Sequence, residues 1–305
     1  MKTDVVMVKD FRKVYGTQVA AAGISFVVNQ GEIFGLLGPN GAGKTTTLEC
    51  LEGLRKPDSG DLRVMGIDPM RDPKKLSKHI GVQLQTSGLP ANMTVQESLK
   101  FFSVYHRLEP NYTILERLGL AEKRQSQYIH LSLGQQRKLA LALAIAHNPQ
   151  VILLDEPTAG LDVSTRSELH KLMKELKEAG HTIILATHDM AEAEKMTDQI
   201  AILLRGKIVA SGSAREITAK GSTATKVTVC TEQALLQQNL VNFPAVTQQS
   251  MIDEYSIYFS TDPGATVNAI LAYLTEHQDK LIDLRVERPS LEERFLEITD
   301  SGEKS

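Results

Sequence analysis

The residues best suited to chemistry stand together at positions 38–46, where the chain reads Gly-x-x-x-x-Gly-Lys-Thr between an apolar run and a helix-like stretch. In such a loop the glycines let backbone N–H groups turn inward as an anion nest, and the following helix adds the positive end of its dipole. Lys44 can then reach the β- and γ-phosphates of a nucleotide, and the Thr45 hydroxyl can ligate Mg²⁺. The alternative is an ordinary glycine turn that caps a helix, and Lys-Thr in register argues against it. We predict a nucleotide-binding loop made of Gly38, Pro39, Asn40, Gly41, Ala42, Gly43, Lys44, Thr45 and Thr46.

Acidic and histidine side chains follow two apolar runs further along the chain. Asp155 and Glu156 come directly after residues 151–154, and His188 follows residues 182–187. Continuous apolar runs of this length are typical of strands buried on both faces of a parallel sheet. Because such sheets present their ligands at the carboxyl ends of the strands, we expect these side chains to lie near the phosphate loop. Taken singly, the acids can also be a strand end that caps a helix, and the histidine a surface residue.

The elements that position these groups alternate between strand and helix. Two buried strands with a helix at about 164–179 between them form a βαβ unit, and residues 5–31 read as antiparallel strands. Residues 86–147 read as a mostly helical insertion, in which Thr94-x-x-Glu97 is a capping box. We predict an α/β domain with a parallel-sheet core, an antiparallel β subdomain and a helical insertion.

Composition excludes several classes of protein. The 305 residues suffice for about two domains, and a net charge of −3 provides no basic field for nucleic acid, so no nucleic-acid partner is expected. The two cysteines match no metal spacing and suggest a reduced intracellular protein. The longest apolar run is far shorter than the roughly 18 residues of a membrane span, and the start has no signal-peptide apolar region. If the protein works on a membrane, another chain must cross it.

A polar stretch at residues 220–223 marks the predicted domain boundary. We place the nucleotide-binding domain at residues 1–217 and a small C-terminal α+β accessory domain at residues 222–305. The order β, α, two strands, α, β, α after the boundary is compatible with a split βαβ sandwich. No catalytic constellation stands out in this second domain.

The residues that identify a family are Leu131-Ser132-Leu133-Gly134-Gln135, about twenty positions before the Asp155 strand. Over about residues 1–213 the chain resembles the ATP-binding-cassette (ABC) ATPases, which are P-loop NTPases with a Leu-Ser-Gly-Gly-Gln signature in a helical subdomain. Five motifs occur in the family's order: the phosphate loop, a glutamine loop, the signature, the Asp-Glu strand with Gly160-Leu161-Asp162 after it, and the histidine.

This resemblance implies a role for each matching residue. Tyr15 corresponds to an aromatic that stacks on adenine, although packing alone can explain a tyrosine beside strands. Gln85 fits the loop that senses Mg²⁺, water and the membrane partner, with Gln83 as the alternative register. The resemblance further implies Asp155 as a Mg²⁺-linked carboxylate beside Thr45 and Gln85, Glu156 as the general base, His188 as a γ-phosphate contact and Asp162 as a coupling residue between two ATP sites.

The signature departs from the family at one position, because Leu133 stands where glycine is usual. Ser132-x-x-Gln135 is also a capping-box pattern, so these residues can simply begin a helix over about 136–146. The two interpretations are compatible, since a capped helix N-terminus is an anion site. If Leu133 lies in the first helical turn, its backbone needs no positive φ. Ser132, Gly134 and Gln135 can then still face ATP held by a second subunit.

The tail, Arg288-Pro289-Ser290-Leu291-Glu292-Glu293-Arg294-Phe295-Leu296, resembles the ending of ATPase subunits of type-2 ABC exporters for drugs, antibiotics or sodium, although a plain amphipathic helix is the alternative. We therefore predict an ATP- and Mg²⁺-dependent ATPase that dimerises with itself or a paired ABC ATPase. It would lie at the inner face of the cell membrane through a separate transmembrane permease. The alternatives are a soluble ABC ATPase acting on ribosomes or DNA, and a nucleotide-dependent regulator without transport.

Overall fold

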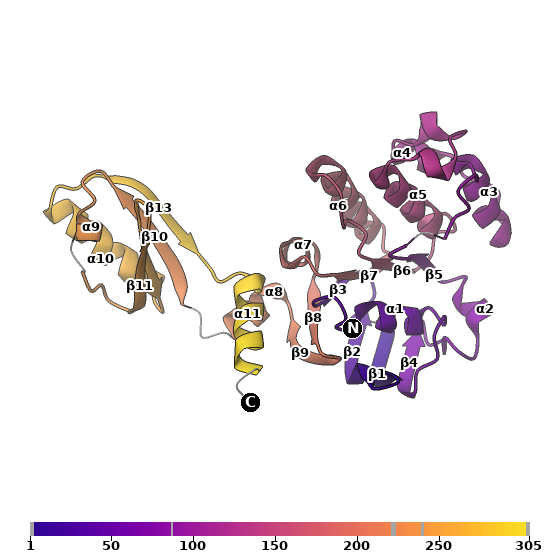
Figure 1. Ribbon diagram of the computed structural model, residues 1–305, viewed down its shortest axis with the longest axis horizontal. Coiled ribbons are helices and arrows are strands. Elements are labelled where there is room, and N and C mark those ends of the chain that lie inside the picture. The colour runs from indigo at the N-terminus through magenta and orange to yellow at the C-terminus, as the bar shows by residue number, and fades with distance from the viewer. Residues whose placement is uncertain (1–2, 87, 221–223, 239–240, 303–305) are drawn as a thin grey trace. The chain divides into compact units, whose positions relative to one another are not determined.

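The computed structural model describes residues 3–86, 88–220, 224–238 and 241–302. The chain divides into two compact units, residues 1–214 and 215–305, and each is described by itself. The division falls in the short helix α8 (Ala214–Ala219). Figure 1 follows the element order from the N-terminus to the C-terminus.

A six-stranded sheet forms the centre of the first unit, in the order β5-β6-β7-β3-β8-β9. Its strands are parallel except for β9, which pairs antiparallel with β8. The predicted buried strands are confirmed, because every residue of β3, β6 and β7 is buried. The bounds are β3 (Ile33–Leu37), β5 (Ile80–Gln83), β6 (Val151–Asp155), β7 (Thr182–Thr187), β8 (Gln199–Leu204) and β9 (Lys207–Gly212).

Alternate residues of these strands build two hydrophobic cores on opposite faces of the sheet. Val151 and Leu153 of β6 belong to a core shared with the antiparallel strands and α1, whereas Ile152 and Leu154 belong to a core shared with the helical insertion and α6. Burial on both faces explains why the strand sequence is apolar throughout and does not alternate. The helices beside the sheet are α1 (Lys44–Leu51), α2 (Pro73–Leu76), α6 (Val163–Glu178) and α7 (Met190–Met196).

A three-stranded antiparallel sheet, in the order β2-β1-β4, covers the first of these cores. The antiparallel strands predicted for residues 5–31 are therefore confirmed, and they form a long hairpin that turns after Tyr15. The bounds are β1 (Asp4–Tyr15), β2 (Gln18–Asn29) and β4 (Ser59–Val64).

The helical insertion contains α3 (Val95–Tyr105), α4 (Thr113–Arg117), the 3₁₀ helices η1 (Ala121–Lys123) and η2 (Tyr128–His130), and α5 (Leu133–Ile145). Both predicted capping boxes are present, at Thr94 with Glu97 and at Ser132 with Gln135. The predicted start of the second helix, at residue 136, is wrong, because α5 begins at Leu133. The Ser132 side chain accepts from the Gln135 N–H, so the first turn is complete from Leu133 onward.

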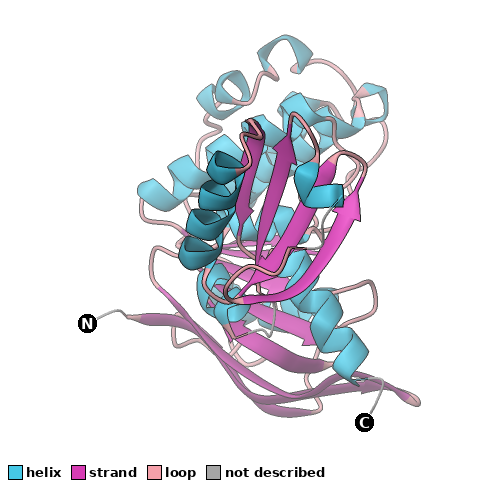
Figure 2. Cartoon of the chain, turned by 90° about the vertical axis from the view of Figure 1, so that its left-hand side faces the viewer, coloured by secondary structure: helices cyan, strands magenta, loops and turns pink. Residues whose placement is uncertain are grey.

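The second unit has a four-stranded sheet in the order β11-β12-β10-β13, with every neighbouring pair antiparallel. This arrangement is that of two interleaved split βαβ units. Figure 2 shows helices on one face of this sheet, and Ile270 and Leu274 of α10 pack there against Val227 and Val229 of β10. The bounds are β10 (Thr225–Thr231), α9 (Leu235–Gln238), β11 (Val246–Ile252), β12 (Tyr255–Ser260), α10 (Pro263–Glu276), β13 (Leu281–Glu287) and α11 (Leu291–Gly302).

Two helices of the second unit can be compared with their local sequence patterns. The first helix predicted after the domain boundary is short, since α9 covers four residues, and residues 239 and 240 lie outside the described part. The tail helix α11 begins at Leu291, where Ser290 accepts from the Glu293 N–H at 3.2 Å and the Glu293 carboxylate accepts from the Ser290 N–H at 2.9 Å. Pro289-Ser290 therefore acts as a helix start.

Candidate active site

The phosphate loop lies between the end of β3 and the start of α1, as its sequence predicts. Gly43 has φ +107°, and a Cβ there would lie 2.0 Å from the carbonyl oxygen of Ala20. At Gly38 a Cβ would lie 2.3 Å from the carbonyl oxygen of Leu203. Both distances are far below van der Waals contact, so the loop backbone runs where only glycine fits.

Lys44, the first residue of α1, lies buried inside the curve of the loop. Its Nζ donates to the carbonyl oxygens of Gly38 at 2.7 Å and Pro39 at 3.3 Å. The same Nζ lies 3.3 Å from Glu156 Oε1. The ammonium group is thus held at the centre of an anion nest, where its charge can meet the terminal phosphates of a nucleotide.

Glu156 joins this lysine to the end of the neighbouring strand. Its backbone N–H donates to the carbonyl of Ala186, which keeps β6 and β7 together one residue past the end of β6. Its Oε2 lies 2.8 Å from His188 Nδ1, and the carboxylate is buried while His188 is half exposed. The structure therefore brings Lys44, Glu156 and His188 into one chain of contacts.

Asp155 is the last residue of β6 and is buried beside α1, the helix that follows the phosphate loop. Burial raises the pKa of this carboxyl, while a hydrogen bond from the Thr45 side chain opposes the rise. Its Oδ1 is buried without a hydrogen-bond partner. A hydroxyl next to an unpartnered carboxylate oxygen is an oxygen donor set that suits Mg²⁺, whose other ligands are commonly phosphate and water. Among the described residues no group of three or more His, Cys, Asp or Glu could hold a metal by itself.

A cavity of about 380 Å³ opens beside the loop. Its lining includes Tyr15, Lys44, Thr45, Gln85 and Glu156, so residues from four separate segments meet there. Between the two candidate registers, Gln85 is the glutamine that lines this cavity. Gln83 is buried at the end of β5 and lines a different groove. The strand β5 ends at Gln83, so Gln85 lies two residues beyond the hydrogen-bonded ladder.

Tyr15 ends β1 at the rim of the same cavity with 38% of its surface exposed. The Lys13 ammonium and the Arg55 guanidinium lie 5.3 and 5.5 Å from its ring centre. The ring is thus accessible for stacking and flanked by positive charge. Sequence reasoning missed two further lining residues, Gln18 and Ala20 of β2. The turn after Tyr15, which folds β2 back beside the loop, is the only sequence signal for them.

The signature residues lie elsewhere in this chain. Ser132 caps α5, and the described lining of the phosphate-loop cavity does not include Ser132, Gly134 or Gln135. Leu133 occupies the first turn of α5 and is absent from the described non-glycine residues with positive φ, which confirms the expected backbone. Its side chain is 47% exposed. The start of α5 is therefore a capped helix N-terminus that does not line this chain's own phosphate-loop cavity.

Asp162 caps the helix that follows the Asp-Glu strand. Its carboxylate accepts from the Thr165 N–H at 3.0 Å and from the Thr165 hydroxyl at 2.7 Å. These bonds lower the pKa of Asp162. A Cβ on Gly134 would lie 3.0 Å from Thr165 Cγ2, so the start of α5 contacts the start of α6. Asp162 is held rigidly, next to the signature.

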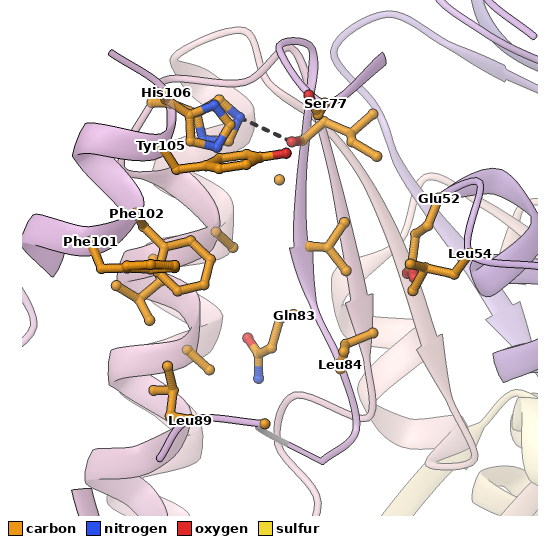
Figure 3. A pocket seen from close by; sticks show the side chains of 18 of the residues that line it. Glu52, Leu54, Ser77, Gln83, Leu84, Leu89, Phe101, Phe102, Tyr105 and His106 are labelled. Carbon is orange, nitrogen blue, oxygen red and sulfur yellow. Dashed lines mark hydrogen bonds between the residues drawn. The ribbon is translucent and has the colours of Figure 1, made fainter. Parts of the chain in front are cut away.

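A groove of about 730 Å³ runs along β5, the edge strand of the main sheet (Figure 3). Phe102 and Tyr105 of α3 form one wall, and Leu54 and Leu84 lie on the other side of the strand. Phe101, Tyr105 and Leu54 are each at least 60% exposed. Gln83 points into the groove, and neither polar atom of its amide has a hydrogen-bond partner. The groove is a mostly apolar surface that also offers buried hydrogen-bonding groups.

Comparison with known proteins identifies a family. The family described as "ABC transporter" matches residues 21–159. The chain is 31% identical to the linearmycin resistance ATP-binding protein LnrL of Bacillus subtilis over 304 residues, 95% of this chain and 97% of that protein. It is 38% identical to Nod factor export ATP-binding protein I of Ralstonia nicotianae, over 70% of this chain and 69% of that protein.

Solved structures support the same fold. One described as the ATP binding subunit of an ABC transporter is similar with a TM-score of 0.66 and 29% identity, covering 71% of this chain and 92% of that chain. Another, described as a nucleotide-free ATP-binding cassette from an ABC transporter, has a TM-score of 0.64 and 26% identity, covering 71% and 94%. Within the described residues, no helix combines the length and apolar character needed to cross a bilayer.

Proposed function

Because the chain belongs to the ABC transporter family of ATP-binding proteins, we propose that it is the ATP-hydrolysing subunit of an exporter whose permease is a separate chain. ATP binding and ATP hydrolysis coupled to transport are the family's activity. The placement of Glu156 between Lys44 and His188 at the phosphate loop carries the proposal. Export as the direction is supported by the names of the two relatives, which concern linearmycin resistance and Nod factor export.

The proposed chemistry is attack of water on the γ-phosphorus of ATP. Glu156 accepts the proton as the water oxygen bonds to phosphorus, and the bond to the β–γ bridging oxygen breaks to release ADP. Lys44 and the loop N–H groups hold the charge of the phosphate oxygens, and His188 contacts the transferred group. Tyr15 stacks on the base. Thr45, Asp155 and Gln85 would hold Mg²⁺, which when bound neutralises phosphate charge.

We further propose that two subunits close around two ATP molecules. The capped start of α5 bears Ser132, Gly134 and Gln135, and its N–H groups suit an anion brought by another molecule. Asp162, held beside this start, would couple the two sites. The ATP-binding domain would comprise residues 1–217 and the accessory domain residues 222–305. Pairing with a different ABC ATPase would use the same surfaces.

The groove along β5 is the proposed docking site for a cytoplasmic segment of the permease, which would hold the protein at the inner face of the membrane. Its exposed aromatic wall on α3 favours burial against a partner. The groove also borders the strand that leads to Gln85, so docking and the ATP site share one segment of chain.

Co-purification tests this function. A tagged chain extracted from membranes in mild detergent should carry with it a chain of about six apolar spans. Phe101→Asp, on the aromatic wall, should release that partner but leave ATP binding intact. Ile252→Asp, at a similarly exposed apolar residue of β11, is the matched control. Co-sedimentation with ribosomes and no membrane partner would instead support the soluble ABC ATPase.

A further inference from the structure

Arg137, in the second turn of α5, holds the backbone of the Gln85 loop. Its Nη1 donates to the carbonyl oxygen of Gln85 at 2.6 Å and lies 3.5 Å from that of Leu84. The two residues are 52 positions apart, and one belongs to the helical insertion while the other follows a strand of the main sheet. We infer that Arg137 is a positioning residue for ATP hydrolysis, which fixes the loop so that the Gln85 side chain faces the phosphate site.

The loop needs such a support because the sheet does not reach it. The last register pair of β5 with β6 joins Gln83 to Leu154, and Gln85 lies two residues beyond. Gln85 is exposed, yet it must line the cavity that Lys44 and Glu156 also line. A charge-assisted hydrogen bond to its carbonyl restrains the backbone without occupying the side chain. The Gln85 amide is thus left to act on the nucleotide and its metal.

The support is itself firmly held. Leu139 and Leu141, on the same helix, are fully buried in the core beneath the insertion, so the base of the Arg137 side chain moves with the insertion as a body. One guanidinium nitrogen, Nη1, reaches both successive carbonyls, and the guanidinium keeps its positive charge at any working pH. The bond therefore ties the position of the helical insertion to the position of Gln85.

This link has a consequence for the groove along β5. Ala140, Leu143 and Ala144 of α5 line one side of the groove, and Val82 and Gln83 of β5 line another. A segment that enters the groove between α5 and β5 would press on both of these elements. Arg137 joins the same two elements, because it connects α5 to the loop that follows β5. This step rests on the proposed function, because it assumes that a permease segment is the occupant.

A double-mutant cycle on the purified chain tests the inference by single-turnover ATP hydrolysis. Arg137→Met should slow hydrolysis about tenfold, the effect of losing roughly one charge-assisted hydrogen bond, with little change in ATP affinity. Gln85→Ala should also slow it. The double variant should match Gln85→Ala alone, because Arg137 acts only by placing the side chain that Gln85→Ala removes. Arg137→Lys should restore part of the rate.

Lys138→Met is the matched control, since Lys138 is the next cation on α5 and pairs with Glu168 on α6. It should hydrolyse ATP like the parent. The inference would be overturned by an unchanged hydrolysis rate in Arg137→Met. It would also be overturned if Arg137→Met slowed the Gln85→Ala variant by the same factor as it slows the parent. If Arg137→Met does not fold, Arg137→Gln serves in the same cycle. A normal rate in Gln85→Ala would reject the proposed role of Gln85 itself, a separate failure.

Discussion

Leu133 lies against Gly160: a Cβ built on the glycine would come within 3.1 Å of Leu133 Cδ2. Gly160 has φ +75° and precedes Leu161 and Asp162, so the side chain that departs from the family's signature rests on the loop that leads to α6. The Leu133 side chain therefore packs against the Gly160 loop of its own subunit. Ser132 stays free at the helix start, apart from its capping bonds to Gln135.

This contact leads to a prediction for ATP-driven dimerisation. The parent should dimerise with ATP, and Leu133→Gly should strengthen dimerisation only a few fold, because the leucine restrains the Gly160 loop without covering Ser132. The glycine itself costs about 1 kcal/mol of helix stability, so Leu133→Ala is the control that removes the contact and keeps helix propensity. Light scattering in a Glu156→Gln background gives the dimer fraction. A monomeric parent rescued by Leu133→Gly would show that the leucine blocks closure.

Removal of the proposed base should separate binding from hydrolysis. Glu156→Gln should lower the hydrolysis rate by about 10²-fold or more, the usual contribution of a general base, while ATP still binds and the dimer persists. Phosphate release and size-exclusion chromatography with ATP measure the two effects. Glu122→Gln, at an exposed position of η1, should behave like the parent. Turnover at the parental rate in Glu156→Gln would remove Glu156 from the base role.

Base stacking on Tyr15 should appear in the dissociation constant of ATP. Tyr15→Ala should raise Kd about tenfold, since stacking on an aromatic ring contributes roughly 1–3 kcal/mol per base. Tyr15→Phe keeps the ring and should bind like the parent. Calorimetric titration at fixed salt compares the three proteins, because Lys13 and Arg55 beside the ring also attract phosphate. Equal affinity of all three proteins for ATP would mean that Tyr15 only packs at the edge of the sheet and does not stack on the base.

Much of this site could be predicted from sequence because its signals are local. The phosphate loop, the buried strands β6 and β7 and the capping boxes at Thr94 and Ser132 each lie within one short stretch, where residue type and backbone geometry determine each other. The choice between Gln83 and Gln85 could not be made that way. It depends on where β5 ends, and strand ends are set by pairing with a distant partner.

Contacts across long separations were beyond prediction for the same reason. The bond between Arg137 and the Gln85 carbonyl and the contact of Leu133 with Gly160 join segments that only the folded sheet brings together. The residue type alone predicts neither partner; an arginine on a helix, for example, is ordinarily solvated. The groove along β5 depends on the folded arrangement of α3 and α5 as well.

Glu52 should make stability fall as the pH rises. It lies buried at the end of α1, and burial, with Asp155 and Glu49 nearby, raises its pKa to about 8 from an ordinary 4.5. The folded chain therefore holds a proton that the unfolded chain releases above pH 4.5, and this stabilisation is lost as the pH approaches 8. Relative to the parent, Glu52→Gln should gain about 1.4 kcal/mol of unfolding free energy per pH unit across that window. Urea unfolding at several pH values measures the difference in unfolding free energy between Glu52→Gln and the parent. The titration of all other groups cancels from this difference. A difference that stays constant with pH would mean that Glu52 is ionised in the folded protein.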